Sequence, residues 1–194
     1  IYIIILELLN FSAVSLLLRW ADGYEREPVS TILWSISWGA FPAIALTSMF
    51  SKEQYPLILA AMIEEFSKLI GFYIVYRRGS INSPTDAFVI AGYIGIGFML
   101  FEDYAYAVSS SDPIYTLVTR GIFSAFAHTL FSGIGAAIMF ILWEKLGFSG
   151  VAVGFICSYL IHFSWNSILQ INLAYTHPII HIILYAIDPP LFPS

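Results

Sequence analysis

Charged residues are scarce in this sequence: they make up 11% of its 194 residues, whereas 59% are hydrophobic. A soluble domain carries about 25% charged residues, and so few polar side chains cannot cover a water-facing surface. The same scarcity excludes a disordered chain, a coiled coil and a collagen-like fibre. It also excludes a nucleic-acid-binding protein with a basic stripe, so no nucleic acid is expected as a partner. The composition therefore predicts an all-α, polytopic transmembrane helical bundle.

Cysteine and signal-peptide features are almost absent as well. Cys157 is the one cysteine of the sequence, which excludes a disulfide framework and a CxxC metal site. The opening apolar run lacks a positively charged region before it and a cleavage site of small residues after it, so it does not resemble a signal peptide. Because the first residue is isoleucine rather than methionine, we expect a truncated N-terminus. Residues 1–194 are expected to form a single transmembrane domain.

Long apolar runs, in contrast, fill most of the chain. Most of them reach the roughly 20 residues needed to cross about 30 Å of hydrocarbon. They are continuously apolar rather than alternating, which argues against a transmembrane barrel. Asp112-Pro113 has the residue types of an N-cap and a first helical position. The predicted helices, about seven in all, are 1–18, 29–50, 54–76, 86–108, 114–143 and 148–172, with a shorter one at 178–188.

Basic residues are distributed unequally among the predicted loops. The first, third and fifth loops contain Arg19, Arg26, Arg77, Arg78 and Lys145, and the second contains Lys52. Cytoplasmic loops of membrane proteins carry an excess of Lys and Arg. We therefore expect the odd-numbered loops to lie in the cytoplasm, residue 1 to lie outside, and the protein to be integral to the plasma membrane.

Ionisable side chains occur inside four of the predicted helices, where each is costly and usually marks function. Counting a rise of about 1.5 Å per residue places their carboxylates and imidazoles in one layer, from the midplane to the outer side. We expect them to converge on one polar cavity in the extracytoplasmic half of the bilayer. The residues, with one nearby amide, are Glu64, Glu65, Lys68, Glu102, Asp103, Arg120, His128, His162 and Asn166.

The spacing of these residues suggests separate tasks. Lys68 is four residues after Glu64 and three after Glu65, so either carboxylate can pair with it. Neighbouring residues point about 100° apart on a helix, so one glutamate faces the cavity while the other is neutralised. His162 and Asn166 share one helix face.

Water activation is the chemistry that these groups suggest. A carboxylate in a low-dielectric cavity can act as general base near neutral pH, and an imidazole can hold the water and move its proton. The His162/Asn166 pair can stabilise the oxyanion of a cleaved amide. We expect Glu64 to be the base and Glu65 its orienting neighbour.

The same residues resemble the motifs of the PrsW family of intramembrane proteases. Their four segments occur in the family order, and one position departs from the pattern: Asp103 stands where the family usually has Asn. The four segments are Glu64-Glu65-x-x-Lys68, Gly97-Phe98-x-x-x-Glu102-Asp103, His128 after Arg120, and His162-x-x-x-Asn166.

The resemblance implies a glutamate-dependent endopeptidase that cuts membrane-anchored proteins or peptides within the lipid bilayer, near its extracytoplasmic side. Residues 1–194 would then be one protease-like domain. A metal-free mechanism is favoured, so no cofactor is expected. The alternative is zinc, held by Glu64, Glu65, His128 and His162. The expected catalytic residues are Glu64, Glu65, His128, His162 and Asn166, supported by Lys68, Glu102, Asp103 and Arg120.

Two other functions stay open. The PrsW family is related to the Aph subunit of γ-secretase, so a non-catalytic membrane scaffold is one alternative. A proton-coupled transporter is the other, because intramembrane Glu, His and Lys can relay protons; the sequence shows no internal repeat of the kind that transporters have. The HExxH and GxGD motifs are absent, which argues against zinc site-2 and presenilin-type proteases.

Overall fold

The computed structural model describes residues 2–23, 25–50, 57–124 and 126–187, and describes the backbone alone for 2–4, 6, 57, 122–124 and 169–187. Every regular element in these ranges is helical, which confirms the predicted all-α class. The elements are α1 (Tyr2–Ala21), α2 (Val29–Trp38), the π-helical turn η1 (Gly39–Ala43), α3 (Ile44–Ser48), α4 (Leu57–Arg77), α5 (Pro84–Ser109), α6 (Pro113–Ser124), α7 (Ala127–Leu146) and α8 (Phe148–Ile187).

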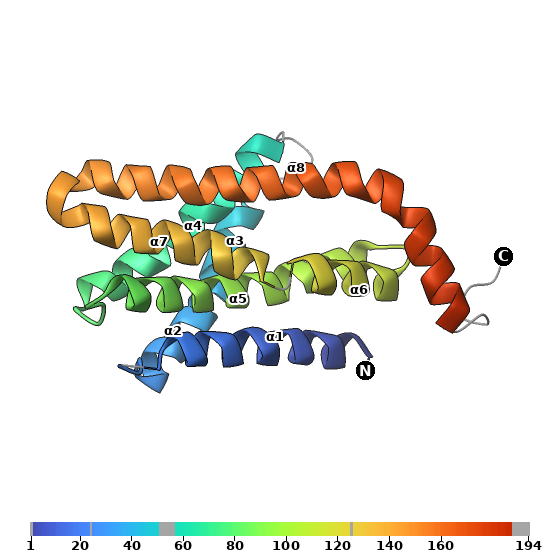
Figure 1. The fold of residues 1–194 in the computed structure, drawn as a ribbon, viewed down its shortest axis with the longest axis horizontal. Coiled ribbons are helices and arrows are strands. Elements are labelled where there is room, and N and C mark those ends of the chain that lie inside the picture. Colours follow the sequence, from blue (N-terminus) through green and yellow to red (C-terminus); the bar gives the residue numbers. More distant parts are fainter. Residues whose placement is uncertain (1, 24, 51–56, 125, 188–194) are drawn as a thin grey trace.

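Helix α5 is the centre of the bundle (Figure 1). It packs against α7, which forms an antiparallel hairpin with α8, and α1 lies along it on the other side. Val89, Ile90, Ile94 and Ile96 of α5 are fully buried between these neighbours. The second half of the hairpin, α8, also contacts α4. Side chains from α4, α5, α7 and α8 can therefore meet inside one bundle.

Four helical stretches among the described residues are long and apolar enough to cross a membrane. They are Val29–Ser48, Pro84–Ser109, Ala127–Leu146 and Phe148–Ile168. Helix α4 is of similar length but carries Glu64, Glu65 and Lys68 in its middle. The chain is an integral membrane protein by length and composition of its helices.

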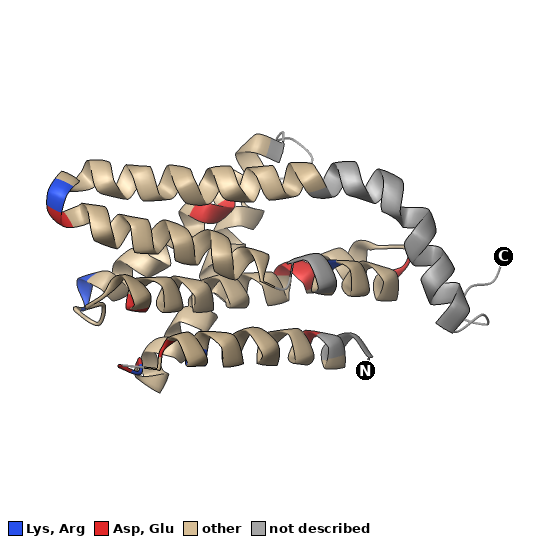
Figure 2. Cartoon of the chain, viewed as in Figure 1, with Lys and Arg blue, Asp and Glu red and all other residues tan. Residues whose placement is uncertain are grey.

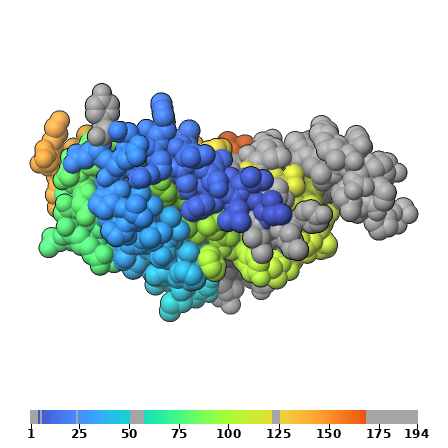
Figure 3. Space-filling view, turned by 90° about the horizontal axis from the view of Figure 1, so that it is seen from below, coloured from blue at the N-terminus to red at the C-terminus, as the bar shows by residue number. Residues whose placement is uncertain are grey.

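The basic residues of the loops gather at one end of the bundle (Figure 2). Their blue segments lie at the α7–α8 turn, after α4 and near the α1–α2 loop, at the left of the view, whereas a further blue segment lies within α6. These are three of the loops that the sequence predicts to be cytoplasmic; Lys52, the basic residue of the second loop, lies outside the described residues. On the face shown in Figure 3, where blue marks the N-terminal part of the chain, α1 and α2 cover much of the bundle.

Side chains and special backbone conformations set several helix ends. The hydroxyl of Ser83 accepts the N–H of Asp86 at 3.1 Å, with Pro84 in the first turn of α5. The carboxylate of Asp112 accepts the N–H of Tyr115 at 3.0 Å, which confirms the predicted cap of α6. Between α7 and α8, Gly147 has a φ of 52°, a conformation that residues with a Cβ rarely adopt.

One predicted boundary is wrong in a way that affects the site. The sequence predicts one helix over 114–143, whereas the structure has α6 and α7 there. The two halves follow different neighbours, because α6 packs against α1 and α5 while α7 packs against α5 and α8. His128 consequently lies in the first turn of α7 rather than far along one long helix.

Two further boundaries differ from the prediction. The predicted pieces 148–172 and 178–188 are one helix, α8, which runs through Pro178. Proline removes one backbone donor and can kink a helix without ending it. Pro42 lies inside the predicted span 29–50, and there the helix widens into η1.

Candidate active site and metal centre

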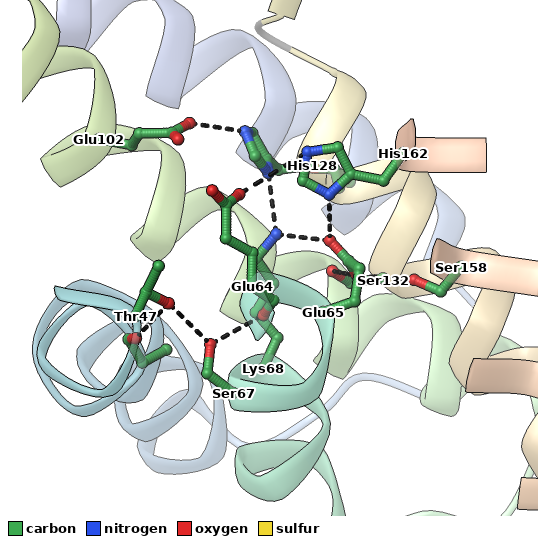
Figure 4. A network of polar contacts seen from close by, with 12 residues as sticks. Thr47, Glu64, Glu65, Ser67, Lys68, Glu102, His128, Ser132, Ser158 and His162 are labelled. Atoms are coloured by element: carbon green, nitrogen blue, oxygen red, sulfur yellow. Dashed lines mark hydrogen bonds and ion pairs between the residues drawn. The ribbon is translucent and has the colours of Figure 1, made fainter. Parts of the chain in front are cut away.

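Helix α4 places three ionisable side chains in the interior of the bundle (Figure 4). Glu64, Glu65 and Lys68 expose only 3%, 2% and 2% of their surface. The ammonium of Lys68 lies 2.7 Å from Oε1 of Glu65. The spacing allowed Lys68 to pair with either glutamate, and the structure pairs it with Glu65.

Glu65 is surrounded by hydrogen-bond donors from three helices. Its Oε1 accepts from Nζ of Lys68 and from Nδ1 of His162, which is 2.9 Å away. Its Oε2 accepts from the hydroxyls of Ser132, at 3.1 Å, and Ser158, at 2.6 Å. A carboxylate has about four acceptor sites, so these donors use its full capacity. The task of Glu65 as the orienting neighbour stays a prediction.

The two serines were not among the predicted site residues. Ser132 is one helical turn after His128 on α7, and Ser158 is one turn before His162 on α8. Residues four apart share a helix face. Each serine could therefore have been found as the polar neighbour of a predicted histidine.

His162 is oriented by Glu65. Because a carboxylate only accepts, the bond between them requires the proton on Nδ1 of His162. The other ring nitrogen, Nε2, lies 3.7 Å from Oε2 of Glu64. In the neutral imidazole Nε2 then carries a lone pair that faces the Glu64 carboxylate.

His128 is oriented from two sides. An ammonium has donors only, so Lys68 donates to Nδ1 of His128, 2.9 Å away. The opposite nitrogen, Nε2, carries the proton and donates to Oε2 of Glu102 at 3.0 Å. The rings of His128 and His162 meet edge to face, with centroids 5.1 Å apart.

Three of the four predicted supporting residues, Glu102, Asp103 and Arg120, lie behind His128, where α5 meets α6. Nη2 of Arg120 donates to Oε2 of Glu102 at 2.7 Å, and its Nε donates to Oδ1 of Asp103. The guanidinium thus holds both carboxylates, and Glu102 in turn holds His128.

Asn166 is the one predicted site residue that lies apart. It is half-buried on α8, one turn beyond His162. In the part of the chain that the structure describes, its side chain joins none of the hydrogen bonds of the cluster. Its role as an oxyanion donor stays a prediction.

A cavity of about 220 Å³ adjoins the network between α3 and α5. Its walls include Phe98, Phe101, Ala105 and Thr47, and Glu102 also lines it. The predicted polar cavity is therefore divided into a dense hydrogen-bonded network and a mainly apolar space beside it. In Figure 4 a chain of hydroxyls from Thr47 through Ser67 to the backbone of Glu64 ties the wall of this space to α4.

Three of the buried residues have the chemistry of a metal site. Glu64, His128 and His162 each offer one ligand atom, and these atoms lie within 4.8 Å of one another. Two imidazoles and a carboxylate are a donor set of catalytic zinc sites. Each imidazole also binds a second carboxylate, Glu65 or Glu102, an arrangement that commonly orients histidine ligands. The residues present therefore fit a metal ion.

The comparisons with known proteins agree with this chemistry. The family described as "PrsW family intramembrane metalloprotease" matches residues 27–188. The matched region contains every residue of the cluster. No curated protein and no solved structure matches the chain.

The expectation of a mechanism without a cofactor is wrong. The matching family is one of metalloproteases, and the chain brings together a Glu/His/His group that suits a metal. The sequence placed these residue types at similar depth but could not show which of their atoms converge. Of the four residues named for the zinc alternative, Glu65 is outside this group, because its oxygens are used by its own donors.

Proposed function

Because the chain belongs to the PrsW family of intramembrane metalloproteases, we propose that it is a metal-dependent endopeptidase that hydrolyses membrane-anchored proteins. The observation that carries the proposal is the meeting of one carboxylate and two imidazoles from α4, α7 and α8. Their ligand atoms lie within 4.8 Å of one another in the interior of the bundle. Residues 1–194 act in this proposal as one protease domain.

Glu64, His128 and His162 would hold the metal. Bound there, a zinc ion would supply Lewis-acid chemistry, polarising a carbonyl and making water a stronger nucleophile. Glu64 would help to hold the metal, and its carboxylate would take the proton of the attacking water. Asn166 donates to the oxyanion, as the sequence predicts.

The remaining members of the network fix these groups in place. Glu65 holds the proton of His162 on Nδ1, and Glu102 holds the proton of His128 on Nε2. Arg120 donates to both Glu102 and Asp103 and so holds Glu102 in place. Such preorganisation keeps catalytic groups in one geometry through the reaction.

The substrate is proposed to approach through the cavity between α3 and α5. Aromatic walls suit apolar side chains of a membrane-anchored segment, and Glu102 connects this space to His128. The protein is proposed to lie in the plasma membrane. The basic end of the bundle is proposed to face the cytoplasm. In Figure 2 the acidic segments in the middle of α4 and in the second half of α5 lie away from that end, which supports an active site toward the extracytoplasmic half.

The test is cleavage by purified protein in vesicles. Candidate single-pass proteins from the native membrane are reconstituted with it, and new fragments are identified by mass spectrometry. Glu64→Gln and His162→Ala are expected to abolish the formation of fragments. Glu144→Gln, the same substitution at an exposed residue of α7, should leave it unchanged. Cleavage by Glu64→Gln at the wild-type rate would refute the assignment. Absence of cleavage by every form would favour a scaffold.

A further inference from the structure

Lys68 contacts the proposed metal site through a metal ligand. Its ammonium lies 2.9 Å from Nδ1 of His128 and 2.7 Å from Oε1 of Glu65. It also stands 4.3 Å from the centre of the Phe98 ring. The side chain is 2% exposed, so its charge is neutralised by these neighbours rather than by water.

The contact between Lys68 and His128 has a consequence for any cation at the site. A neutral imidazole has one lone pair and one N–H. If His128 ligates a metal through Nδ1, the lone pair that now accepts from Lys68 is used. If it ligates through Nε2, the proton moves to Nδ1 and points at the ammonium. Lys68 cannot keep its hydrogen bond to His128 in either case.

We propose that Lys68 competes with the metal for His128 and thereby lowers the metal affinity of the site. This inference rests on the metal site of the proposed function. It concerns binding alone and can be tested without a substrate. When the metal binds, Lys68 gives up His128 and keeps its ion pair with Glu65 and its place over Phe98.

The charges of the site argue in the same direction. The metal group contains one carboxylate and two imidazoles, and the Lys68 ammonium touches one of the imidazoles. Two cations close together in a low-dielectric interior repel each other. Removing the Lys68 charge therefore favours a bound cation, in addition to freeing the nitrogen of His128.

The experiment measures Zn²⁺ affinity of detergent-purified, chelator-stripped protein by competition with a chromophoric chelator. Lys68→Met is expected to bind at least about tenfold more tightly than wild type, or about 1.4 kcal/mol. Glu65 keeps donors from His162, Ser132 and Ser158 in this variant, which supports its folding. Arg120→Met is the matched control: it removes a cation that binds Glu102 and Asp103, so its gain should be clearly smaller.

Equal zinc affinity of wild type and Lys68→Met, or a gain no larger than that of Arg120→Met, would overturn the proposal. So would the absence of zinc binding in all forms. Neither of the two affinity results for Lys68→Met bears on whether cleavage depends on Glu64. Failure of this inference can therefore be distinguished from failure of the proposed function.

A second measurement needs no variant at Lys68. The ¹⁵N spectrum of histidine-labelled, metal-free wild type, assigned with His128→Asn, should show His128 protonated on Nε2. Protonation on Nδ1 would contradict the Lys68 contact on which the inference depends.

Discussion

Glu64 and Glu65 are adjacent in sequence but have different surroundings. The oxygens of Glu65 accept from Lys68, His162, Ser132 and Ser158, whereas Glu64 faces Nε2 of His162. The angle of about 100° between neighbouring helical residues predicts this division. It does not predict which glutamate takes which place, because that depends on where α7 and α8 lie around α4.

The amide of Asn166 is the proposed oxyanion donor, and a single substitution tests it. If its amide donates to the oxyanion, Asn166→Ala should lower kcat by about 10²–10³ fold, with thermal stability close to wild type. The measurement is the rate of fragment formation with a substrate identified as above.

Ser167→Ala is the control for this variant, because the Ser167 hydroxyl bonds only the backbone of its own helix, at Phe163, among the hydrogen bonds described. It should leave the rate unchanged. Equal rates for both variants would remove Asn166 from the site.

At the scale of helices, the contact between α5 and α7 fixes the position of His128. A Cβ on Gly95 would lie 2.5 Å from the carbonyl oxygen of His128, which is backbone and cannot give way. Gly95→Ala is therefore expected to displace the start of α7, cost roughly 1–3 kcal/mol of stability and weaken zinc binding. Thermal unfolding in detergent and the zinc titration check both effects.

Gly92→Ala is the matched change one turn away on α5. Its Cβ would meet the ends of the Leu18 and Thr129 side chains at 3.1 Å, and these can shift. It should bind zinc like wild type. If Gly95→Ala behaves in the same way, the close contact does not position His128.

The helices that the sequence predicts well are those with a clear polar boundary. Asp112 caps α6 as expected, and the loop around Arg77 and Arg78 separates α4 from α5. The break between α6 and α7 has no such signal, since no proline and no acidic residue stands there and the two helices differ mainly in their neighbours. The sequence therefore identifies His128 as a site residue but predicts the wrong position for it along a helix.

At the scale of the whole molecule, the clustered basic loops predict a topology. In a Cys157→Ser background, Asn82→Cys tests the α4–α5 loop and Ser111→Cys tests the α5–α6 turn; both positions are exposed. A membrane-impermeant maleimide should label Ser111→Cys on intact cells and Asn82→Cys only after permeabilisation. The reverse pattern would place the active site toward the cytoplasm.

If substrates enter through the cavity between α3 and α5, as proposed above, its size restricts what could be cut. An α-helix with its side chains is about 10–12 Å across, so two turns of it fill roughly 1,000 Å³, which is more than the whole empty space at this site, about 560 Å³ with its open mouth. A bilayer-spanning substrate would have to unwind locally before its main chain came near Glu102. Segments interrupted by glycine or proline, whose helical state is the least stable, would then be cleaved in preference to uninterrupted leucine-rich anchors.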